Sequence, residues 1–234
     1  MTAPLRGVTH LGIDADDTLW HSENRFQAVH QRYHALLAEH VDVDVDDLER
    51  RMLETERRNL RLFGYGAKGF TLSLIETAID ITDGAIPTPA IATILEFGKD
   101  LLDHPVELLD GVAEAIDDLR ARGLGLVLIT KGDLWHQESK VAASGIADRF
   151  DGIEIVAEKD VATYAAILAR HGIDPSTFCM VGNSVRSDVL PVLELGGRAV
   201  HVPYTYLWAH EAVEDPGGEL LVAATLREVV ELLG

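Results

Sequence analysis

The stretch that decides the fold is LGIDADDTLW, residues 11–20. An apolar run typical of a buried strand ends there in Asp14, Asp16 and Asp17, and Thr18 follows at once. Carboxylates this close repel one another, and burying one without a partner is costly. The pattern therefore indicates a strand whose end carries acidic groups for a purpose other than folding.

The chain beyond this stretch alternates between strand-like and helix-like patterns. Apolar runs predict strands, and patterns of helical spacing end at Gly123 and at Gly172 between them. This alternation predicts an α/β fold, with a Rossmann-like parallel sheet flanked by helices. The predicted strands are residues 8–14, 123–130, 152–157, 178–182 and 198–202, with a short last edge strand at 220–224.

Residues 20–104 differ from the rest because they contain helical patterns and no strand-like run. Thr88 followed by Pro89 is typical of a helix start, since proline fits the first helical position. We therefore predict two domains. A catalytic core comprises residues 1–19 and 105–234, and a helical-bundle cap domain of residues 20–104 is inserted after the first strand.

The formal net charge is −19, from 20 basic and 39 acidic residues. This balance argues against nucleic acid and anionic membranes as partners. No apolar run is long enough to span a membrane, and the first residues lack the features of a signal peptide, so we expect a cytoplasmic protein. The acidic surface favours a monomer or a small homo-oligomer. The single cysteine, Cys179, excludes an internal disulfide framework and fits a buried strand.

Polar side chains follow each of the first four predicted strands. Ligands of parallel α/β sheets bind at the carboxyl ends of the strands, so these side chains are expected to converge. Carboxylate and amide oxygens suit Mg²⁺, whereas a hydroxyl and lysines suit phosphate oxygens. The residues are Asp14, Asp16 and Thr18; Thr130 and Lys131; Lys159; and Asn183 with Asp188.

The same residues carry a resemblance to a known family. DADDTLW resembles the DxDxT signature of the haloacid dehalogenase superfamily, in particular of its phosphatase branch. Thr130 after an apolar run is similar to the second motif, Lys159 to the third, and VGNSVRSD (residues 181–188) to the fourth. The order of the motifs and the helical insert after the first one also match.

The resemblance implies a role for each residue. Asp14 would be the nucleophile that forms an aspartyl-phosphate, and Asp16 the general acid and base. Thr130, with Lys131 beside it, would hold the transferring phosphoryl group, and Lys159 would neutralise Asp14 and the phosphate. Asp14, the backbone carbonyl of Asp16, Asn183 and Asp188 would bind Mg²⁺. Asp17 is assigned to turn geometry and supporting hydrogen bonds.

Two positions depart from the family pattern. Asn183 stands where the family usually has aspartate, which removes one negative charge from the metal site. Lys131 replaces the common asparagine after Thr130.

In the cap, FGYGAKGF (residues 63–70) resembles the loop by which such caps reach over the active site, so Tyr65 and Lys68 are candidates for substrate contact.

We therefore expect a Mg²⁺-dependent phosphatase acting on a small phosphorylated metabolite. A true haloacid dehalogenase is an alternative, but such enzymes lack the second aspartate, here Asp16. A phosphomutase or phosphotransferase would need a cap residue that keeps water inactive, and Lys68 or His21 could serve. A non-catalytic phosphate-binding regulator is the third alternative, supported by Asn183 alone.

Overall fold

The computed structural model describes residues 5–206, 208–213, 218 and 220–233. The chain divides into two compact units. The first, the sheet unit, comprises residues 1–23 and 106–234, and the second, the helical unit, comprises residues 24–105. The sequence placed the corresponding boundaries at residues 19/20 and 104/105.

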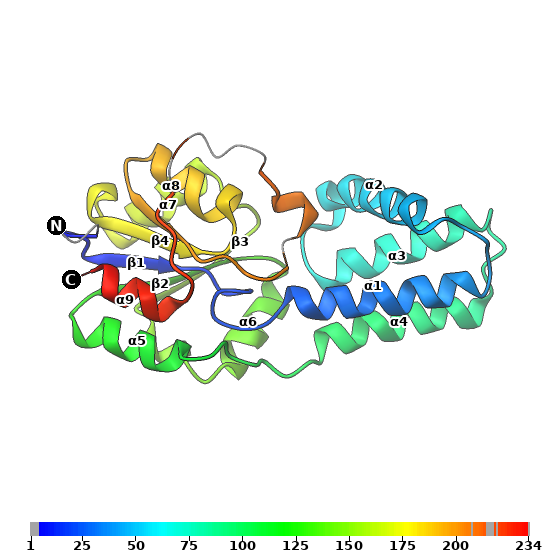
Figure 1. The fold of residues 1–234 in the computed structure, drawn as a ribbon, viewed down its shortest axis with the longest axis horizontal. Coiled ribbons are helices and arrows are strands. Elements are labelled where there is room, and N and C mark those ends of the chain that lie inside the picture. Colours follow the sequence, from blue (N-terminus) through cyan, green and yellow to red (C-terminus); the bar gives the residue numbers. More distant parts are fainter. Residues whose placement is uncertain (1–4, 207, 214–217, 219, 234) are drawn as a thin grey trace. The chain divides into compact units, whose positions relative to one another are not determined.

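The sheet unit is built on five parallel strands in the order β3-β2-β1-β4-β5 (Figure 1). Because β1 lies in the middle, its carboxyl end is flanked by those of β2 and β4, with Ile13 aligned with Leu128 and Val181. The strands are β1 (His10–Ile13), β2 (Gly125–Lys131), β3 (Gly152–Val156), β4 (Phe178–Gly182) and β5 (Arg198–His201).

Helices flank this sheet and complete the predicted α/β fold, which is confirmed. Five of them are α5 (Val112–Ala121), α6 (Leu134–Ala143), α7 (Val161–His171), α8 (Leu190–Glu194) and α9 (Leu226–Leu232). Short turns of 3-10 helix occur at Ala147–Arg149, Pro175–Thr177 and Ala209–Glu211, and a π-helical turn occurs at Val185–Val189. Asp160 and Gly172 cap the two ends of α7, as their residue types favour.

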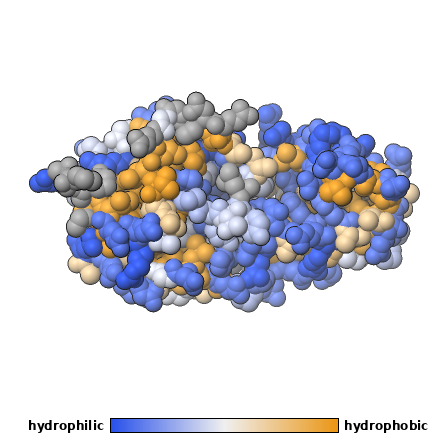
Figure 2. Space-filling view, in the orientation of Figure 1, coloured by the Kyte–Doolittle hydropathy of each residue, from blue (hydrophilic) through white to orange (hydrophobic). Residues whose placement is uncertain are grey.

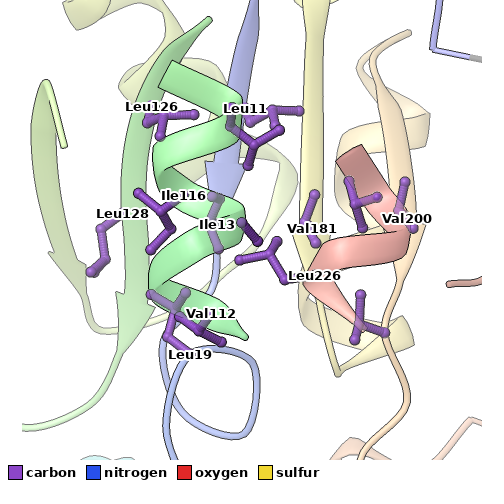
Figure 3. Packing of buried hydrophobic residues seen from close by; sticks show 14 of the residues in the cluster. Leu11, Ile13, Leu19, Val112, Ile116, Leu126, Leu128, Val181, Val200 and Leu226 are labelled. Carbon is purple, nitrogen blue, oxygen red and sulfur yellow. The ribbon is translucent and has the colours of Figure 1, made fainter. Parts of the chain in front are cut away.

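The central strands are buried on both faces, as parallel strands covered by helices must be. Alternate residues of β2 illustrate this: Leu126 and Leu128 belong to one apolar cluster, and Val127 and Ile129 to another. Figure 3 shows the first cluster, in which side chains of α5 and α9 meet those of the strands. At Gly12 a Cβ would lie 2.5 Å from the ring of Phe178, so a larger residue there would force this buried ring to shift.

The predicted edge strand at residues 220–224 is wrong. Within residues 220–224 the structure has a single bridge, between His201 and Val222. Two backbone hydrogen bonds flank it, from His201 to Leu221 and from Ala223 to His201. The chain then turns at once into α9, whose N-cap is Thr225, so no length remains for a longer ladder.

The helical unit contains α2 (Val45–Phe63), α3 (Ala67–Ile81) and α4 (Thr88–Leu102), together with α1 (Glu23–Ala38) after its first residue. These helices enclose an apolar core of their own, and the hydroxyl of buried Tyr33 donates to the carbonyl of Leu74 at 2.8 Å. The face of this unit visible in Figure 2 is mostly hydrophilic. Among the helices that the structure describes, none is long and apolar enough to cross a membrane.

Candidate active site

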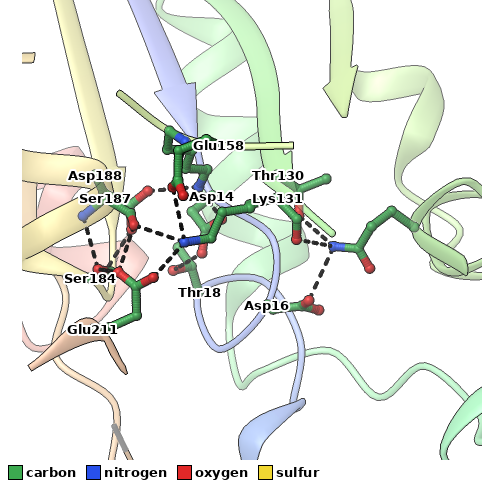
Figure 4. Close-up of polar contacts among 12 residues, drawn as sticks. Asp14, Asp16, Thr18, Thr130, Lys131, Glu158, Ser184, Ser187, Asp188 and Glu211 are labelled. Carbon is green, nitrogen blue, oxygen red and sulfur yellow. Dashed lines mark hydrogen bonds and ion pairs between the residues drawn. The ribbon is translucent and has the colours of Figure 1, made fainter. Parts of the chain in front are cut away.

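Polar side chains from several strand ends meet at the carboxyl edge of the sheet (Figure 4). The backbone N–H of Asp14 donates to Val181 at 2.9 Å, so this residue extends the ladder between β1 and β4 by one position. That register fixes the direction of its side chain. Thr18 then returns toward Asp14, and its hydroxyl donates to Oδ2 of the carboxylate at 3.3 Å.

The centre of the site is a buried lysine held between two carboxylates. Nζ of Lys159 donates to Oδ1 of Asp14 at 2.5 Å and to Oδ1 of Asp188 at 2.7 Å. All three side chains are less than one-tenth exposed. A buried charge requires partners of opposite sign, and here two carboxylates share one ammonium group, which leaves one negative charge in excess.

Burial and charge shift the pKa values of this group in opposite directions. Burial raises the pKa of Asp14 to about 7; Lys159 opposes this rise, and Asp188 adds to it. Burial favours the neutral form of Lys159, but Asp14 and Asp188 together raise its pKa well above the usual value. Lys159 therefore remains a cation beside Asp14 at neutral pH.

Asp188 is fixed by the turn that follows β4. The backbone N–H of Ser184 donates to its Oδ2 at 3.0 Å, and Ser184 caps the π-helical turn by accepting from Ser187. A Cβ at Gly182 would lie 2.2 Å from Oδ2 of Asp188, so this carboxylate occupies the space that glycine leaves. Ser184 is thus a cap residue.

Asp16 does not share the lysine of Asp14. Its carboxylate accepts hydrogen bonds from Lys140, from the indole of Trp20 at 2.7 Å and from Gln137 at 3.1 Å. Burial opposes ionisation of Asp16, but the pairing with Lys140 outweighs it and lowers the pKa of the carboxyl below its usual value. Neither Lys140 nor Gln137 was singled out from the sequence, although both follow Thr130 on the next helix.

Thr130 and Lys131 end β2 in different surroundings. The buried hydroxyl of Thr130 accepts from Nε2 of Gln137 at 2.6 Å, so its own hydrogen can be donated elsewhere. Lys131 is bound by Glu211 at 2.5 Å, and its Nζ also lies 3.2 Å from the hydroxyl of Ser187. The sequence predicted positive charge at Lys131 but not the carboxylate that pairs with it.

Glu211 ties the segment after β5 to the site. Its second oxygen accepts from Ser184 at 2.5 Å and from Ser187 at 2.6 Å. Burial opposes its ionisation, but Lys131 and the two hydroxyl groups lower the pKa of Glu211 below the usual value. No motif or periodicity around residue 211 marks it in the sequence.

Asp17 lies in the turn rather than in the cluster. It adopts a positive φ of 61° and accepts backbone hydrogen bonds from Ser22 and Glu23, where α1 begins. Burial, reinforced by the charge of Asp16, raises the pKa of Asp17 to about 8. Its contacts agree with the turn role predicted from the sequence.

The two connections to the helical unit run side by side within the sheet unit. Trp20 forms an antiparallel bridge with Leu108, and His21 donates its backbone N–H to Glu107 at 3.0 Å. The imidazole of His21 hydrogen-bonds the hydroxyl of Tyr204 at 2.6 Å. The segments that lead into and out of the helical unit are therefore held together by hydrogen bonds next to the DxDxT turn.

Tyr65 and Lys68 belong to the helical unit, between α2 and the first turn of α3. This connection lies beside the beginning of α1, since the rings of Phe26 and Phe70 meet edge to face at 5.1 Å. The contact of Tyr65 and Lys68 with a substrate stays a prediction.

The oxygen groups at the sheet edge fit Mg²⁺. When both are ionised, Asp14 and Asp188 carry one negative charge more than Lys159 neutralises, and the described residues give the amide of Asn183 no hydrogen-bond partner. Its backbone carbonyl accepts from His201 at 3.0 Å, which fixes the turn. The described residues form no group of three His, Cys, Asp or Glu side chains able to hold a metal. Mg²⁺ does not require one, because it usually takes one or two carboxylates and keeps several waters.

Cys179 is remote from this chemistry. It lies in β4 with no exposed surface, and burial raises the pKa of its thiol to about 12. Since a nucleophilic cysteine must be accessible and readily ionised, this thiol is a packing residue, as predicted.

Comparison with solved structures shows the same fold in several hydrolases. The chain is similar to a haloacid dehalogenase-like family hydrolase from Xanthomonas campestris, with 42% identity, a TM-score of 0.82, and coverage of 97% of this chain and 92% of that one. A predicted phosphoglycolate phosphatase from Haemophilus somnus shares 16% identity with a TM-score of 0.65, over 97% and 98% of the two chains. An L-2-haloacid dehalogenase from Xanthobacter autotrophicus with chloropropionic acid covalently bound shares 15% identity with a TM-score of 0.63, over 96% and 98%.

The last two structures share the fold with the chain at an identity too low to carry an activity across. A comparison with curated proteins gave no match. A family model described as haloacid dehalogenase-like hydrolase matches residues 8–196. Because this match spans most of the chain, and the Xanthomonas protein is similar along nearly its whole length, the chain belongs to the haloacid dehalogenase-like hydrolases.

Proposed function

We propose that the chain is a Mg²⁺-dependent phosphatase that cleaves small phosphomonoesters through a phosphorylated Asp14. The observation that carries this proposal is the separate environment of two aspartates. Asp14 is paired with Lys159, whereas Asp16, two residues later, is paired with a different lysine, Lys140. A nucleophile and a proton-transfer group need such separate environments.

The nucleophilic step falls to Oδ2 of Asp14. Oδ1 is engaged by Lys159 at 2.5 Å, whereas Oδ2 accepts, among the residues that the structure describes, only a long hydrogen bond from Thr18. Attack on phosphorus by this oxygen breaks the bond to the leaving group. Lys159, and the free hydrogen of the Thr130 hydroxyl, stabilise the charge on the transferring phosphoryl oxygens.

Proton transfer falls to Asp16. Lys140 keeps Asp16 ionised in the chain alone, so Asp16 must take up a proton as the negatively charged substrate binds, because a nearby negative charge raises the pKa of a carboxyl. In the first step Asp16 gives this proton to the leaving oxygen, and in the second it accepts one from the water that attacks phosphorus and frees Asp14. Asp14, Asp188, the amide oxygen of Asn183 and the carbonyl of Asp16 would hold Mg²⁺. When bound, the ion supplies Lewis-acid stabilisation of phosphate charge.

Dehalogenation is the second candidate, because Lys159 pairs directly with Asp14, and a nucleophilic carboxylate held in this way could also attack carbon. The position of Asp16 favours the phosphatase, since attack on carbon requires no proton for a departing halide. A phosphomutase stays an alternative of the same chemistry, with the phosphoryl group passed to a second substrate in place of water.

The test compares three reactions on the wild-type protein. We expect hydrolysis of p-nitrophenyl phosphate or acetyl phosphate with Mg²⁺, loss of this activity in EDTA, and no chloride release from L-2-chloropropionate. Asp14→Asn should abolish hydrolysis, while Lys99→Met, an exposed lysine of α4, should leave it unchanged. Full activity of Asp14→Asn, or chloride release alone, would contradict the proposal.

A panel of phosphorylated metabolites then defines the substrate. Turnover of one small phosphomonoester is expected, because the resemblance to the family implies that a helical insert of this kind covers the site and excludes bulky substrates. Binding of inorganic phosphate with Mg²⁺ but no turnover across the panel would favour the non-catalytic regulator.

A further inference from the structure

The helix after the second motif presents two polar side chains to the site from the same face. Gln137 and Lys140 are three residues apart on α6, a spacing that places side chains next to each other. Asp133 caps the first turn of this helix by accepting from the N–H of His136, so the start of α6 is fixed immediately after β2. The side chains of Gln137 and Lys140 are therefore carried by a rigid element.

Lys140 contacts both oxygens of the Asp16 carboxylate. Its Nζ lies 2.6 Å from Oδ1 and 2.7 Å from Oδ2. The lysine side chain is only 14% exposed, and 124 residues separate the two positions in the chain. The Asp16 side chain is 30% exposed, so the pair is partly buried. A mobile surface pair contributes little, but a partly buried pair with two short contacts restricts the carboxylate to one orientation.

Two further donors complete the restraint on Asp16. The indole N–H of Trp20, a fully buried residue, donates to Oδ1 at 2.7 Å. Nε2 of Gln137 donates to Oδ2 at 3.1 Å and lies 2.6 Å from the hydroxyl of Thr130. Gln137 itself is buried, and its aliphatic part packs against Gly132, where a Cβ would approach it to 3.1 Å. One side chain thus links the proposed proton donor to the proposed phosphoryl-binding hydroxyl.

We propose that Lys140 is a positioning residue that holds Asp16 in line with the leaving oxygen of the substrate. Gln137, which contacts both Asp16 and Thr130, keeps these two side chains at a fixed separation. This inference rests on the proposed function. Lys140 acts through Asp16, since the hydrogen bonds that the described residues give its ammonium group go to Asp16 and not to Asp14. Its removal should therefore affect proton delivery and leave nucleophilic attack almost intact.

The test uses two substrates of similar size that differ in their need for a proton. Phenoxide leaves poorly without protonation, whereas p-nitrophenolate leaves readily. We compare kcat/KM, which reports the steps up to phosphorylation of Asp14. General acid catalysis contributes about 10²–10⁴-fold, so Lys140→Met should lower kcat/KM about 10²-fold for phenyl phosphate and less than about 10-fold for p-nitrophenyl phosphate.

Matched variants separate positioning from a structural defect. Lys140→Arg, which can still bind a carboxylate through two N–H groups, should restore most of the activity on phenyl phosphate. Lys99→Met should change neither substrate. Adding Lys140→Met to Asp16→Asn should cause no further loss that depends on the leaving group. Equal losses on both substrates, or no loss, would overturn the proposal.

A second measurement does not depend on turnover. The urea midpoints of Lys140→Met, Asp16→Asn and the double variant form a thermodynamic cycle. A double variant with a midpoint shift smaller than the sum of the single shifts supports the pairing, and additive shifts overturn it. If the wild-type protein hydrolyses neither phosphate, the proposed function fails, and this cycle still decides whether Lys140 holds Asp16.

Discussion

Nζ of Lys159 lies 2.5 Å from Oδ1 of Asp14, although 145 residues separate them in the chain. The same ammonium group binds Asp188, so the carboxyl ends of β1 and β4 and the segment after β3 meet at one cation. Two buried carboxylates could not remain close without it. This contact therefore both stabilises the carboxyl edge of the sheet and sets the electrostatic surroundings of Asp14.

Lys159→Met should weaken both the fold and the chemistry. Removing one partner of a buried ion pair costs about 3–5 kcal/mol, and loss of an electrostatic group at the reacting centre lowers kcat by about 10²–10³-fold. Urea denaturation and initial rates on p-nitrophenyl phosphate measure the two effects.

The same variant tests the metal site. With Lys159 gone, Asp14 and Asp188 should depend more on an added cation, so Mg²⁺ should raise the melting temperature of Lys159→Met more than that of the wild-type protein. Lys99→Met, which removes an exposed lysine, serves as the control. Equal shifts with Mg²⁺ in all three proteins would contradict the shared site.

Glu211→Gln should destabilise the protein, whereas Glu158→Gln should not. Both carboxylates contact Lys131, but Glu211 is 11% exposed and Glu158 is 49% exposed. Losing the buried partner leaves Lys131 poorly paired and should lower the free energy of unfolding by about 1–3 kcal/mol. The exposed pair is worth about 0–1 kcal/mol. Urea denaturation of the two variants gives the comparison, and equal effects would show that the 209–211 turn is not anchored through Glu211.

His30 should make the stability of the protein depend on pH. Burial lowers its pKa in the folded chain, an effect that His34 reinforces and that Glu56 and Glu49 oppose. At His30 the unfolded chain therefore binds more protons below the ordinary value of 6.5, so the contribution of this residue to the free energy of unfolding falls as the pH falls. Asp14 and Asp17, whose pKa values are raised to about 7 and about 8, contribute in the opposite sense, so the effect of His30 is the difference in slope between the wild-type protein and a His30 variant. One such proton contributes at most about 1.4 kcal/mol per pH unit.

His30→Gln should remove this contribution, and His40→Gln, at an exposed position, should leave it unchanged. Urea denaturation between about pH 5 and pH 7 provides the slopes for the wild-type protein and both variants, within the range where histidine titrates. A wild-type slope retained in His30→Gln would show that another group is responsible.

The fold could be predicted because its signals are local. Each strand of the sheet is an apolar run, and the ends of the helices between them are marked by residues such as Asp160 and Gly172. The strand expected at residues 220–224 failed because a short apolar run does not reveal that Thr225 starts a helix. The prediction fails here because the sequence does not show whether the strand or the following helix takes these residues.

The candidate site was predictable where its residues stand at strand ends. The rule that parallel strands present their carboxyl ends to a ligand brings Asp14, Lys159 and Asp188 together without knowledge of distances. Their catalytic and metal-binding roles stay predictions. Lys140 and Glu211 were missed because a helix face and an irregular segment acquire their partners only through tertiary packing. The spacing of Gln137 and Lys140 after the N-cap Asp133 could have pointed to Lys140, whereas nothing in the sequence marks Glu211.

The central claim is that Asp14 carries the phosphoryl group during turnover. The measurement is mass spectrometry of the peptide containing Asp14, taken from Asp16→Asn protein quenched in acid during reaction with acetyl phosphate and Mg²⁺. Since that variant lacks the base for the second step, we expect a phosphorylated peptide that is absent from the Asp14→Asn/Asp16→Asn protein. An unmodified Asp14 peptide, while the wild-type protein hydrolyses the same substrate and Asp16→Asn still releases acetate, would contradict the account.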